Sequence, residues 1–240
     1  MTATEKHPIV VVPTYQEREA LPPFLAEFER TGFEALVVDD NSPDGTGEWA
    51  EGFAREHSWL HVLRREGKEG LASAYRAGFA WCLERGYDVV GQMDCDLSHP
   101  PGALGQMSGA LDRGADVVIG SRFSRGGRTV GWPWWRKAQS YAATVPARLM
   151  LRLPVSDLTG GFKLWRADGL RRIDVGSTIS EGYVFQIETT YRAFRAGLRV
   201  VEVPIVFAER AAGESKMSTA IKREGIAVVL RLARQRWRPS

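Results

Sequence analysis

The sequence predicts an α/β protein with a mostly parallel, doubly wound sheet flanked by helices, and with a C-terminal amphipathic helix. Short runs rich in β-branched residues alternate with helical stretches as far as residue 120, and this alternation is typical of βαβ units. The first run, residues 8–13, contains no polar position, which indicates a strand buried on both faces. A chain of 240 residues is long enough to bury a large core without disulfide bonds.

The predicted elements follow one another closely. Strands are expected at residues 8–13, 35–40, 60–63, 89–93 and 115–120, with helices at residues 19–30, 47–56, 71–85 and 103–113. Segment 123–136 is rich in Gly, Trp and Arg and has no period, which predicts a loop. After it we expect a helix at 138–152, a turn at 157–161, a strand at 162–166, a helix at 185–196, a strand at 198–207 and a helix at 219–236.

Composition disfavours several classes of protein. Cys82 and Cys95 are the two cysteines; they are too few for a disulfide framework and lack metal-ligand spacing, which fits a reducing compartment. The segment before the first predicted strand is short and polar, unlike a signal peptide. The sequence contains no run of about 18 apolar residues, so it predicts no membrane-spanning helix. Since no G-x-G-x-x-G follows the first strand, a dinucleotide-binding Rossmann enzyme is disfavoured.

The positive charge of the chain is concentrated at its C-terminal end. Residues 219–240 contain six basic residues and one acidic residue, and a nearly neutral body with a basic end is not typical of a nucleic-acid-binding protein. The expected helix has an apolar face and a basic face, formed by Ile226, Val229, Leu230, Ala233 and Trp237 and by Arg223, Arg231, Arg234 and Arg238. This pattern favours contact with an anionic membrane surface, although such helices also cover ordinary cores.

Three tryptophans in the predicted loop leave two interpretations open. Trp132, Trp134 and Trp135 stand among arginines, and this composition is found at membrane interfaces. The same residues would also suit packing over an edge of the sheet.

A D-x-D motif follows one of the predicted strands. Asp94 and Asp96 come directly after residues 89–93, at the edge of an open α/β sheet where ligands bind. Two carboxylates there favour a hard divalent cation, because Mg²⁺ and Mn²⁺ take oxygen ligands and share them with substrate phosphates. The motif therefore predicts a metal-bridged diphosphate, although a D-x-D by itself is also typical of an acidic turn.

The D-x-D belongs to a set of segments that resembles a known family. These segments are V-V-P-T-Y-Q-E (11–17), V-V-D-D-N-S-P-D-G-T (37–46), D-C-D-L-S-H-P-P (94–101), G-S-R (120–122) and G-E-S-K (213–216). Together they resemble the dolichol-phosphate (polyprenol-phosphate) mannose synthases, which are family 2 glycosyltransferases with the GT-A fold. The resemblance runs from about residue 8 to 218. It implies a catalytic GT-A domain at residues 1–218, followed by a basic amphipathic helix and tail at residues 219–240.

The resemblance also implies a site for a nucleotide sugar, GDP-mannose. The guanosine is expected to contact Pro13, Tyr15, Glu17, Val38, Asp40 and Lys68. The diphosphate is expected to contact Asp94, Cys95, Asp96, Arg210 and Lys216. Mg²⁺ or Mn²⁺ is expected at Asp94, Asp96 and Ser98, and Asp96 is also an expected catalytic residue. Ser98 departs from the family pattern, because several relatives carry Gln there; the shorter side chain implies a bridging water or a weaker metal site.

The acceptor that the resemblance implies is a polyprenyl phosphate. A phosphate monoester is already anionic near neutral pH, since its second pKa is about 6, so it needs orienting cations rather than a strong general base. Planar guanidinium groups suit this task. The resemblance assigns Arg122, Arg136 and Ser140 to the acceptor phosphate, with both arginines as catalytic residues. Glu181 and Glu188 lie where many family 2 transferases keep a base, and we interpret them as structural or positioning groups.

The expected activity is inverting transfer of mannose from GDP-mannose to a polyprenyl (dolichyl-type) phosphate on the cytoplasmic face of a membrane. No short motif fixes the hexose, so transfer of glucose from UDP-glucose is an alternative. A second alternative is a non-catalytic nucleotide-sugar-binding or membrane-adaptor subunit, which the intact acidic and basic motif residues disfavour. Many bacterial relatives carry C-terminal transmembrane helices, and this chain ends at Ser240. We therefore expect peripheral membrane binding or docking on a separate membrane-anchoring protein.

Overall fold

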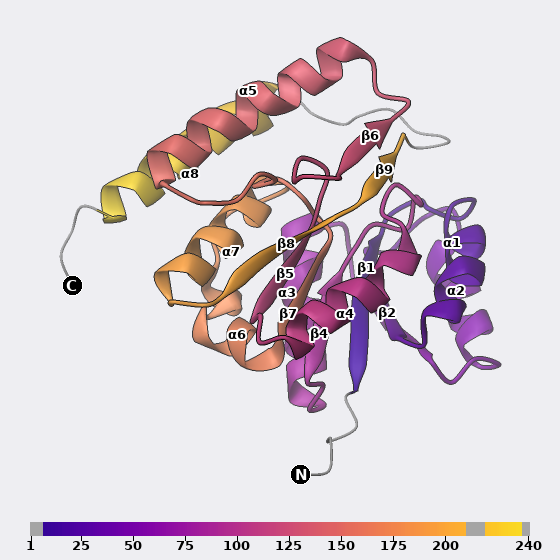
Figure 1. Cartoon of the computed structure of the whole chain (residues 1–240). Helices are drawn as coiled ribbons and strands as arrows, with labels where there is room; N and C mark the ends of the chain where they lie inside the picture. The colour runs from indigo at the N-terminus through magenta and orange to yellow at the C-terminus, as the bar shows by residue number, and fades with distance from the viewer. Residues whose placement is uncertain (1–6, 210–218, 237–240) are drawn as a thin grey trace, which may run out of the picture.

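A seven-stranded sheet forms the centre of the molecule. The computed structural model describes residues 7–209 and 219–236, and Figure 1 shows their arrangement. The strand order is β3-β2-β1-β4-β7-β5-β8. The bounds of these strands are β1 Pro8–Thr14, β2 Glu34–Asp39, β3 Leu60–Arg64, β4 Val89–Gln92, β5 Val117–Ser121, β7 Lys163–Arg166 and β8 Val200–Pro204.

The sheet is mostly parallel, as the sequence predicts. Strands β1 to β4 pair in parallel, as do β5 and β8, whereas β7 runs antiparallel between β4 and β5. Because β7 is reversed, it begins at the edge where β4 and β5 end. The segments that follow β1, β2, β4 and β5 and the segment that precedes β7 therefore meet at one edge of the sheet.

Helices cover both faces of the sheet. Their bounds are α1 Leu21–Phe28, α2 Thr46–Ala54, α3 Leu71–Glu84, α4 Leu104–Asp112, α5 Trp134–Leu151, α6 Ala167–Arg172, α7 Val184–Arg195 and α8 Thr219–Arg236. Val10 and Val12 of β1 pack in the core that contains Phe24 of α1. Ile9 and Val11 point into a second core, which contains α3 and α7. Burial on both faces explains why residues 8–13 of β1 contain no polar residue.

The structure differs from the predicted elements after residue 120. The expected loop at 123–136 contains a short strand, β6 (Arg128–Val130), which pairs in parallel with β9 (Val206–Ala208). Helix α5 begins at Trp134 directly after the extended Pro133, earlier than predicted. The single strand expected at 198–207 is split between β8 and β9. The pairing of β6 with β9 joins distant segments, so no local pattern predicts it.

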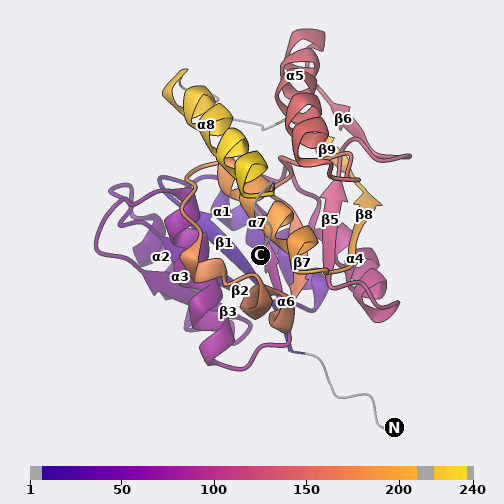
Figure 2. The same ribbon diagram turned by 90° about the vertical axis from the view of Figure 1, so that its left-hand side faces the viewer.

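The C-terminal helix α8 packs against the body of the protein. Val228, Val229 and Leu232 are buried in a third core, together with residues of α5 and α7, and the Tyr191 hydroxyl of α7 donates to the Leu232 carbonyl at 3.1 Å. Figures 1 and 2 show α5 and α8 together at the end of the molecule where the parallel strands finish. Of the predicted apolar face, Val229 is buried but Leu230 is 41% exposed, whereas Val228 and Leu232, which the sequence pattern did not place on that face, are buried. Of the helices in the described part of the chain, none combines the length and the apolar character needed to cross a bilayer.

Close packing of α3 on the sheet depends on Gly78. A Cβ atom at this position would lie 2.4 Å from Val11 Cγ1 and 3.1 Å from Val38 Cγ2. We expect Gly78→Ala to lower the free energy of unfolding by about 1–3 kcal/mol, because the added methyl group forces the sheet and helix apart. Gly52 in α2 is the matched control: no atom lies within 4 Å of its Cβ position, so Gly52→Ala should stabilise by about 0.5–1 kcal/mol. Urea denaturation of both variants checks this, and an unchanged midpoint for Gly78→Ala would contradict the close approach.

Candidate functional site

The loops after β1 and β2 are joined by hydrogen bonds at the edge of the sheet where the parallel strands end. The Thr14 hydroxyl donates to Asp39 Oδ1 at 3.0 Å, the Gln16 N–H to the Ser42 hydroxyl at 3.0 Å and the Glu17 N–H to the Thr46 hydroxyl at 3.1 Å. These bonds hold the V-P-T-Y-Q-E loop against the D-N-S-P-D-G-T loop. Two of the motif segments thus form a single wall joined by three hydrogen bonds.

Asp40 organises the turn that carries Lys68. Its Oδ1 accepts from Arg65 at 2.6 Å, and its Oδ2 accepts the backbone N–H groups of Glu69 and Gly70, each at 3.1 Å. The Lys68 ammonium consequently lies 3.9 Å from the centroid of the Tyr15 ring. The structure brings these two expected nucleotide-binding residues together. It shows Asp40 as a buried group bound to protein donors, and its direct contact with a base stays a prediction.

Pro13 and Val38 support this wall from neighbouring strands. They are partners in the register of β1 and β2, and Val38 is fully buried. Glu17 is partly exposed at the end of the V-P-T-Y-Q-E loop. Residues Arg210 and Lys216, which we expect at the diphosphate, lie outside the described residues.

The D-x-D motif lies directly after β4, as predicted. Ser98 donates both its hydroxyl and its backbone N–H to Asp96 Oδ1, at 2.5 and 3.0 Å. The Cys95 side chain points into the core, and burial raises the pKa of its thiol. Cys95 can therefore offer the site only its backbone, while Asp94 and Asp96 provide carboxylates.

The donor set of this turn suits a hard cation shared with a substrate. Among the residues that the structure describes, no group of three or more His, Cys, Asp or Glu side chains converges to hold a metal. Asp94 and Asp96 would supply two oxygen ligands, and Mg²⁺ or Mn²⁺ commonly completes such a shell with phosphate oxygens and water. Ser98 has a role that the sequence did not predict, because its hydroxyl proton is committed to orienting Asp96.

His99 was not among the predicted site residues, although it lies in the same motif. It is 4% exposed, and its Nδ1 accepts the backbone N–H of Asp94 at 3.1 Å. Its ring stacks on Phe162 and meets Phe207 edge to face, with a centroid distance of 5.4 Å in each case. Burial lowers its pKa, which keeps the imidazole neutral and able to accept. His99 thus fixes the backbone of the D-x-D turn.

Arg122 is held by a buried carboxylate. Its Nε and Nη2 donate to the two oxygens of Asp157, both at 2.7 Å, and Asp157 is fully buried. The Asp157 backbone N–H in turn donates to Glu202 at 2.9 Å. The guanidinium carbon of Arg122 lies 5.1–5.6 Å from the ring centroids of Phe123, Trp132 and Phe207. Asp157 was missed as a site residue; its place in a D-L-T-G-G turn was the only local signal.

Arg136 lies at the start of α5 beside the same aromatic cluster. Its Nη1 donates to Glu209 Oε1 at 2.7 Å, and its guanidinium carbon is 4.6 Å from the Trp132 ring centroid. Ser140 follows one turn later on α5 and is partly exposed. The structure therefore brings Arg122 and Arg136 to one tryptophan.

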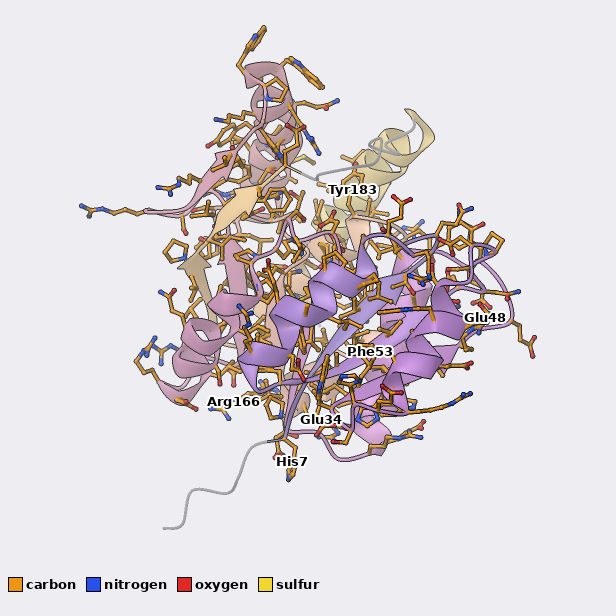
Figure 3. The ribbon with its side chains drawn as sticks, turned by 90° about the vertical axis from the view of Figure 1, so that its right-hand side faces the viewer. His7, Glu34, Glu48, Phe53, Arg166 and Tyr183 are labelled. Carbon is orange, nitrogen blue, oxygen red and sulfur yellow. The ribbon has the colours of Figure 1, made fainter. Side chains whose placement is uncertain are left out.

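The two glutamates expected to have structural roles are both engaged by arginines. Glu188 is 1% exposed and accepts the Ser180 hydroxyl and backbone N–H, at 2.5 and 3.0 Å. Arg192 pairs with its other oxygen at 2.8 Å. Glu181 pairs with Arg76 at 2.8 Å, which ties the segment before α7 to α3. Tyr183 follows this segment and lies close to α8, at the end of the molecule opposite His7 and Glu34 (Figure 3).

Of the three tryptophans in segment 123–136, one packs on the body of the protein and two are exposed. Trp132 packs against Phe207 at a centroid distance of 5.5 Å, whereas Trp134 and Trp135 are 80% and 56% exposed. Helix α5 continues this exposed apolar surface with Tyr141, Val145, Leu149 and Met150.

The D-x-D after β4, the wall formed by the loops after β1 and β2, and the start of the reversed β7 lie at one edge of the sheet. The family model for glycosyl transferase family 2 matches residues 9–174. The chain belongs to glycosyltransferase family 2.

Particular relatives in this family share most of the chain. It is 49% identical over 225 residues to an undecaprenyl-phosphate mannosyltransferase of Micrococcus luteus, covering 93% of this chain and 92% of the relative. It is 44% identical over 221 residues to a polyprenol monophosphomannose synthase of Mycolicibacterium smegmatis, covering 91% and 83%.

Solved structures support the GT-A fold. Glucosyl-3-phosphoglycerate synthase from Mycobacterium tuberculosis, in complex with Mn²⁺, UDP-glucose and phosphoglyceric acid, matches with a TM-score of 0.73 at 19% identity, covering 95% of this chain and 80% of that chain. A mannosyltransferase from Pyrobaculum calidifontis, in complex with GDP-mannose and Mn²⁺, matches with a TM-score of 0.61 at 18% identity, covering 94% and 64%.

Proposed function

We propose that this glycosyltransferase moves mannose from GDP-mannose to a polyprenyl phosphate, with inversion at the sugar C1. The observation that carries the proposal is the position of His99 between two charged groups. On one side it holds the backbone of Asp94; on the other, Phe207 touches both its ring and the Arg122 guanidinium. A diphosphate bound at the D-x-D and a phosphate bound at Arg122 would therefore be neighbours. The names of the relatives support the same donor sugar and acceptor class.

On the donor side, the protein would bind the nucleotide and stabilise its departure. Tyr15 and Lys68 lie together, where they would contact the nucleotide, and Asp94 and Asp96 would hold Mg²⁺ or Mn²⁺. A bound cation would neutralise charge that develops on the leaving diphosphate. Ser98 keeps the Asp96 carboxylate oriented, so little reorganisation is needed as that charge grows. Arg210 and Lys216 are proposed to assist at the same diphosphate.

On the acceptor side, the protein would orient a nucleophile that is already ionised. Arg122 and Arg136 would hold the lipid phosphate, with Ser140 as a further donor, so that one oxygen faces C1 of the mannose. In-line attack from that side would break the bond to the diphosphate and invert the anomeric centre. No strong base is required, because the acceptor carries its negative charge near neutral pH.

Membrane contact is proposed for the end of the molecule formed by α5 and α8. The exposed apolar residues of α5 lie beside the basic helix α8, and both lie at the end of the sheet that holds the site (Figure 2). This arrangement would place the acceptor site near the lipid headgroups, with the protein peripheral on the cytoplasmic face. Docking on a membrane-anchoring protein is the alternative means of recruitment.

Transfer of label into lipid tests the proposed activity. Purified protein is incubated with short and long polyprenyl phosphates, Mn²⁺ or Mg²⁺, and radiolabelled GDP-mannose or UDP-glucose, and the organic phase is counted. We expect label from GDP-mannose alone. Label from UDP-glucose would favour the alternative sugar, and nucleotide-sugar binding without any transfer would favour a non-catalytic subunit.

Charge reversal on α8 tests membrane recruitment. Deleting the helix would also remove core residues such as Val229, whereas Arg231 and Arg234 are exposed and can be changed without opening the core. We expect Arg231→Glu/Arg234→Glu to weaken sedimentation with anionic liposomes, because each basic residue near such a surface contributes about 1 kcal/mol. The wild-type protein should leave the liposomes as salt rises from about 0.05 to 0.5 M.

A second double reversal controls for net charge. Arg30 and Arg55 are exposed and lie shortly before the start of β2 and β3, at the end of the sheet opposite to the candidate site, and Arg30→Glu/Arg55→Glu should sediment like the wild type. Equal losses for the two double variants would show that overall charge, rather than α8, controls binding. Unchanged sedimentation of the α8 variant would assign recruitment to α5 or to a partner protein.

A further inference from the structure

Trp132 lies against both arginines that we propose for the acceptor phosphate. The guanidinium carbons of Arg136 and Arg122 are 4.6 and 5.6 Å from its ring centroid. An indole face attracts a cation through its quadrupole, and the planar guanidinium group stacks well on it. A single side chain therefore fixes the separation of two cations that come from different elements, the end of β5 and the start of α5.

The position of Trp132 is itself determined by the small sheet of β6 and β9. Its ring packs edge to face on Phe207 of β9. Gly131, directly before it, has a φ of 81°, and a Cβ there would lie 2.9 Å from Glu209 Cβ. The backbone N–H of Glu209 donates to the Val130 carbonyl at 3.0 Å. Trp132 and Glu209 are thus held next to each other by backbone pairing.

The two arginines differ in how firmly their carboxylates hold them. Asp157 is fully buried and binds Arg122 through two bonds, so an incoming phosphate would not displace it. The Glu209 side chain is 40% exposed and binds Arg136 through one nitrogen. A phosphate that bridges both guanidinium groups would therefore take the place of Glu209. After the phosphate displaces Glu209 from Arg136, the Trp132 ring still contacts both arginines.

We propose that Trp132 is a positioning residue for the acceptor phosphate: its indole holds Arg122 and Arg136 at the spacing that lets one phosphate bind both. This inference rests on the proposed function. It adds a residue that the motifs do not single out and assigns an aromatic face, rather than a further charge, to acceptor recognition. Glu209 occupies Arg136 before the acceptor arrives and is exchanged for it.

Substitution by Leu and by Phe separates an aromatic role from simple packing. Both fill space, but Leu has no π face and the single ring of Phe is too small to serve both guanidinium groups fully. With farnesyl phosphate as a soluble acceptor, we expect Trp132→Leu to raise the acceptor KM about tenfold or more, which corresponds to the loss of roughly one desolvated cation–π contact. Trp132→Phe should fall between Leu and the wild type. The dissociation constant for GDP-mannose, measured by calorimetry, should stay within about twofold of the wild-type value. A tenfold change in that constant would correspond to about 1.4 kcal/mol.

Trp81 provides the matched control. It carries a guanidinium group in the same kind of contact, with the Arg85 carbon 3.9 Å from its ring, but it lies near the C-terminal end of α3, away from the site. Trp81→Leu should leave the acceptor KM unchanged. An unchanged acceptor KM for Trp132→Leu, or equal values for the Leu and Phe variants, would overturn the role of Trp132.

The outcomes also separate this inference from the proposed function. If the wild type transfers mannose and Trp132→Leu loses acceptor affinity alone, both stand. If the wild type transfers mannose and the Trp132 variants lose GDP-mannose binding as well, Trp132 supports the whole site and the inference is wrong. If the wild type transfers no sugar to any polyprenyl phosphate, the proposed function fails, and the role of Trp132 fails with it.

Discussion

Asp96→Ala is expected to abolish sugar transfer while the protein stays folded. Asp96 follows β4 at the ligand-binding edge, and Ser98 holds one of its oxygens in place. If this carboxylate binds the cation that neutralises the diphosphate, its loss removes stabilisation that grows in the transition state. The cost to the fold includes the two hydrogen bonds from Ser98, about 1 kcal/mol each, and removing one of two neighbouring carboxylates also relieves repulsion.

Transfer assays at saturating Mn²⁺, together with thermal melts, check this expectation. Asp168→Ala is the control, because the Asp168 side chain is 85% exposed on α6 and lies away from the site. Retention by Asp96→Ala of more than about a tenth of wild-type activity, which equals a loss below about 1.4 kcal/mol, would contradict a metal-binding role. A melt lowered by many degrees would instead show that Asp96 stabilises the fold.

Arg136→Ala is expected to remove acceptor binding without harming the fold or the donor site. Arg136 pairs with a partly exposed Glu209, so its loss leaves that carboxylate in contact with solvent. Truncating one partner of a charge pair with the lipid phosphate should cost about 2–5 kcal/mol of transition-state binding. Calorimetric titration should give a nearly unchanged affinity for GDP-mannose.

Arg122→Ala is expected to have two effects, because its partner is buried. Removing Arg122 leaves the fully buried Asp157 without its cation, and breaking such a pair costs about 3–5 kcal/mol of stability. The double variant Arg122→Ala/Asp157→Ala should recover much of that stability and remain inactive. A similar loss of GDP-mannose affinity in Arg122→Ala and Arg136→Ala, with the fold intact, would refute the division between acceptor and donor residues.

Local sequence patterns were sufficient for the elements up to residue 120. Each strand there is a short apolar run, and each helix follows within a few residues, so period and length identify both. The D-x-D was placed correctly after β4 for the same reason. Beyond residue 120 the pattern failed where strands pair at long range: β6 lies in a segment rich in Gly and Trp, and β8 and β9 share one continuous run of residues.

Candidate site residues could be predicted from the sequence where they lie in motifs. Residues that contribute by contacting another site residue could not. Tyr15, Lys68, Asp94 and Asp96 were predicted as site residues from the family resemblance, and the structure places Tyr15 beside Lys68 and both aspartates after β4. The sequence did not predict Asp157, Trp132 and Glu209 as site residues. Each of them contacts Arg122 or Arg136, and only the fold brings these residues together. Likewise, the sequence left open whether Trp132 packs or is exposed, since that depends on Phe207 in a strand more than seventy residues later in the chain.

Strand β7 stands between the two groups of residues that we propose for the donor and for the acceptor. The nucleotide wall and the D-x-D come from β1, β2 and β4, on one side of β7, whereas Arg122 and the two-stranded sheet lie on the side of β5 and β8. Substitutions that change donor binding are therefore expected mainly on the side of β1, β2 and β4, and those that change acceptor binding on the side of β5 and β8. Arg210 and Lys216 are the expected exceptions, because they come after β9 in the sequence but are proposed for the donor diphosphate.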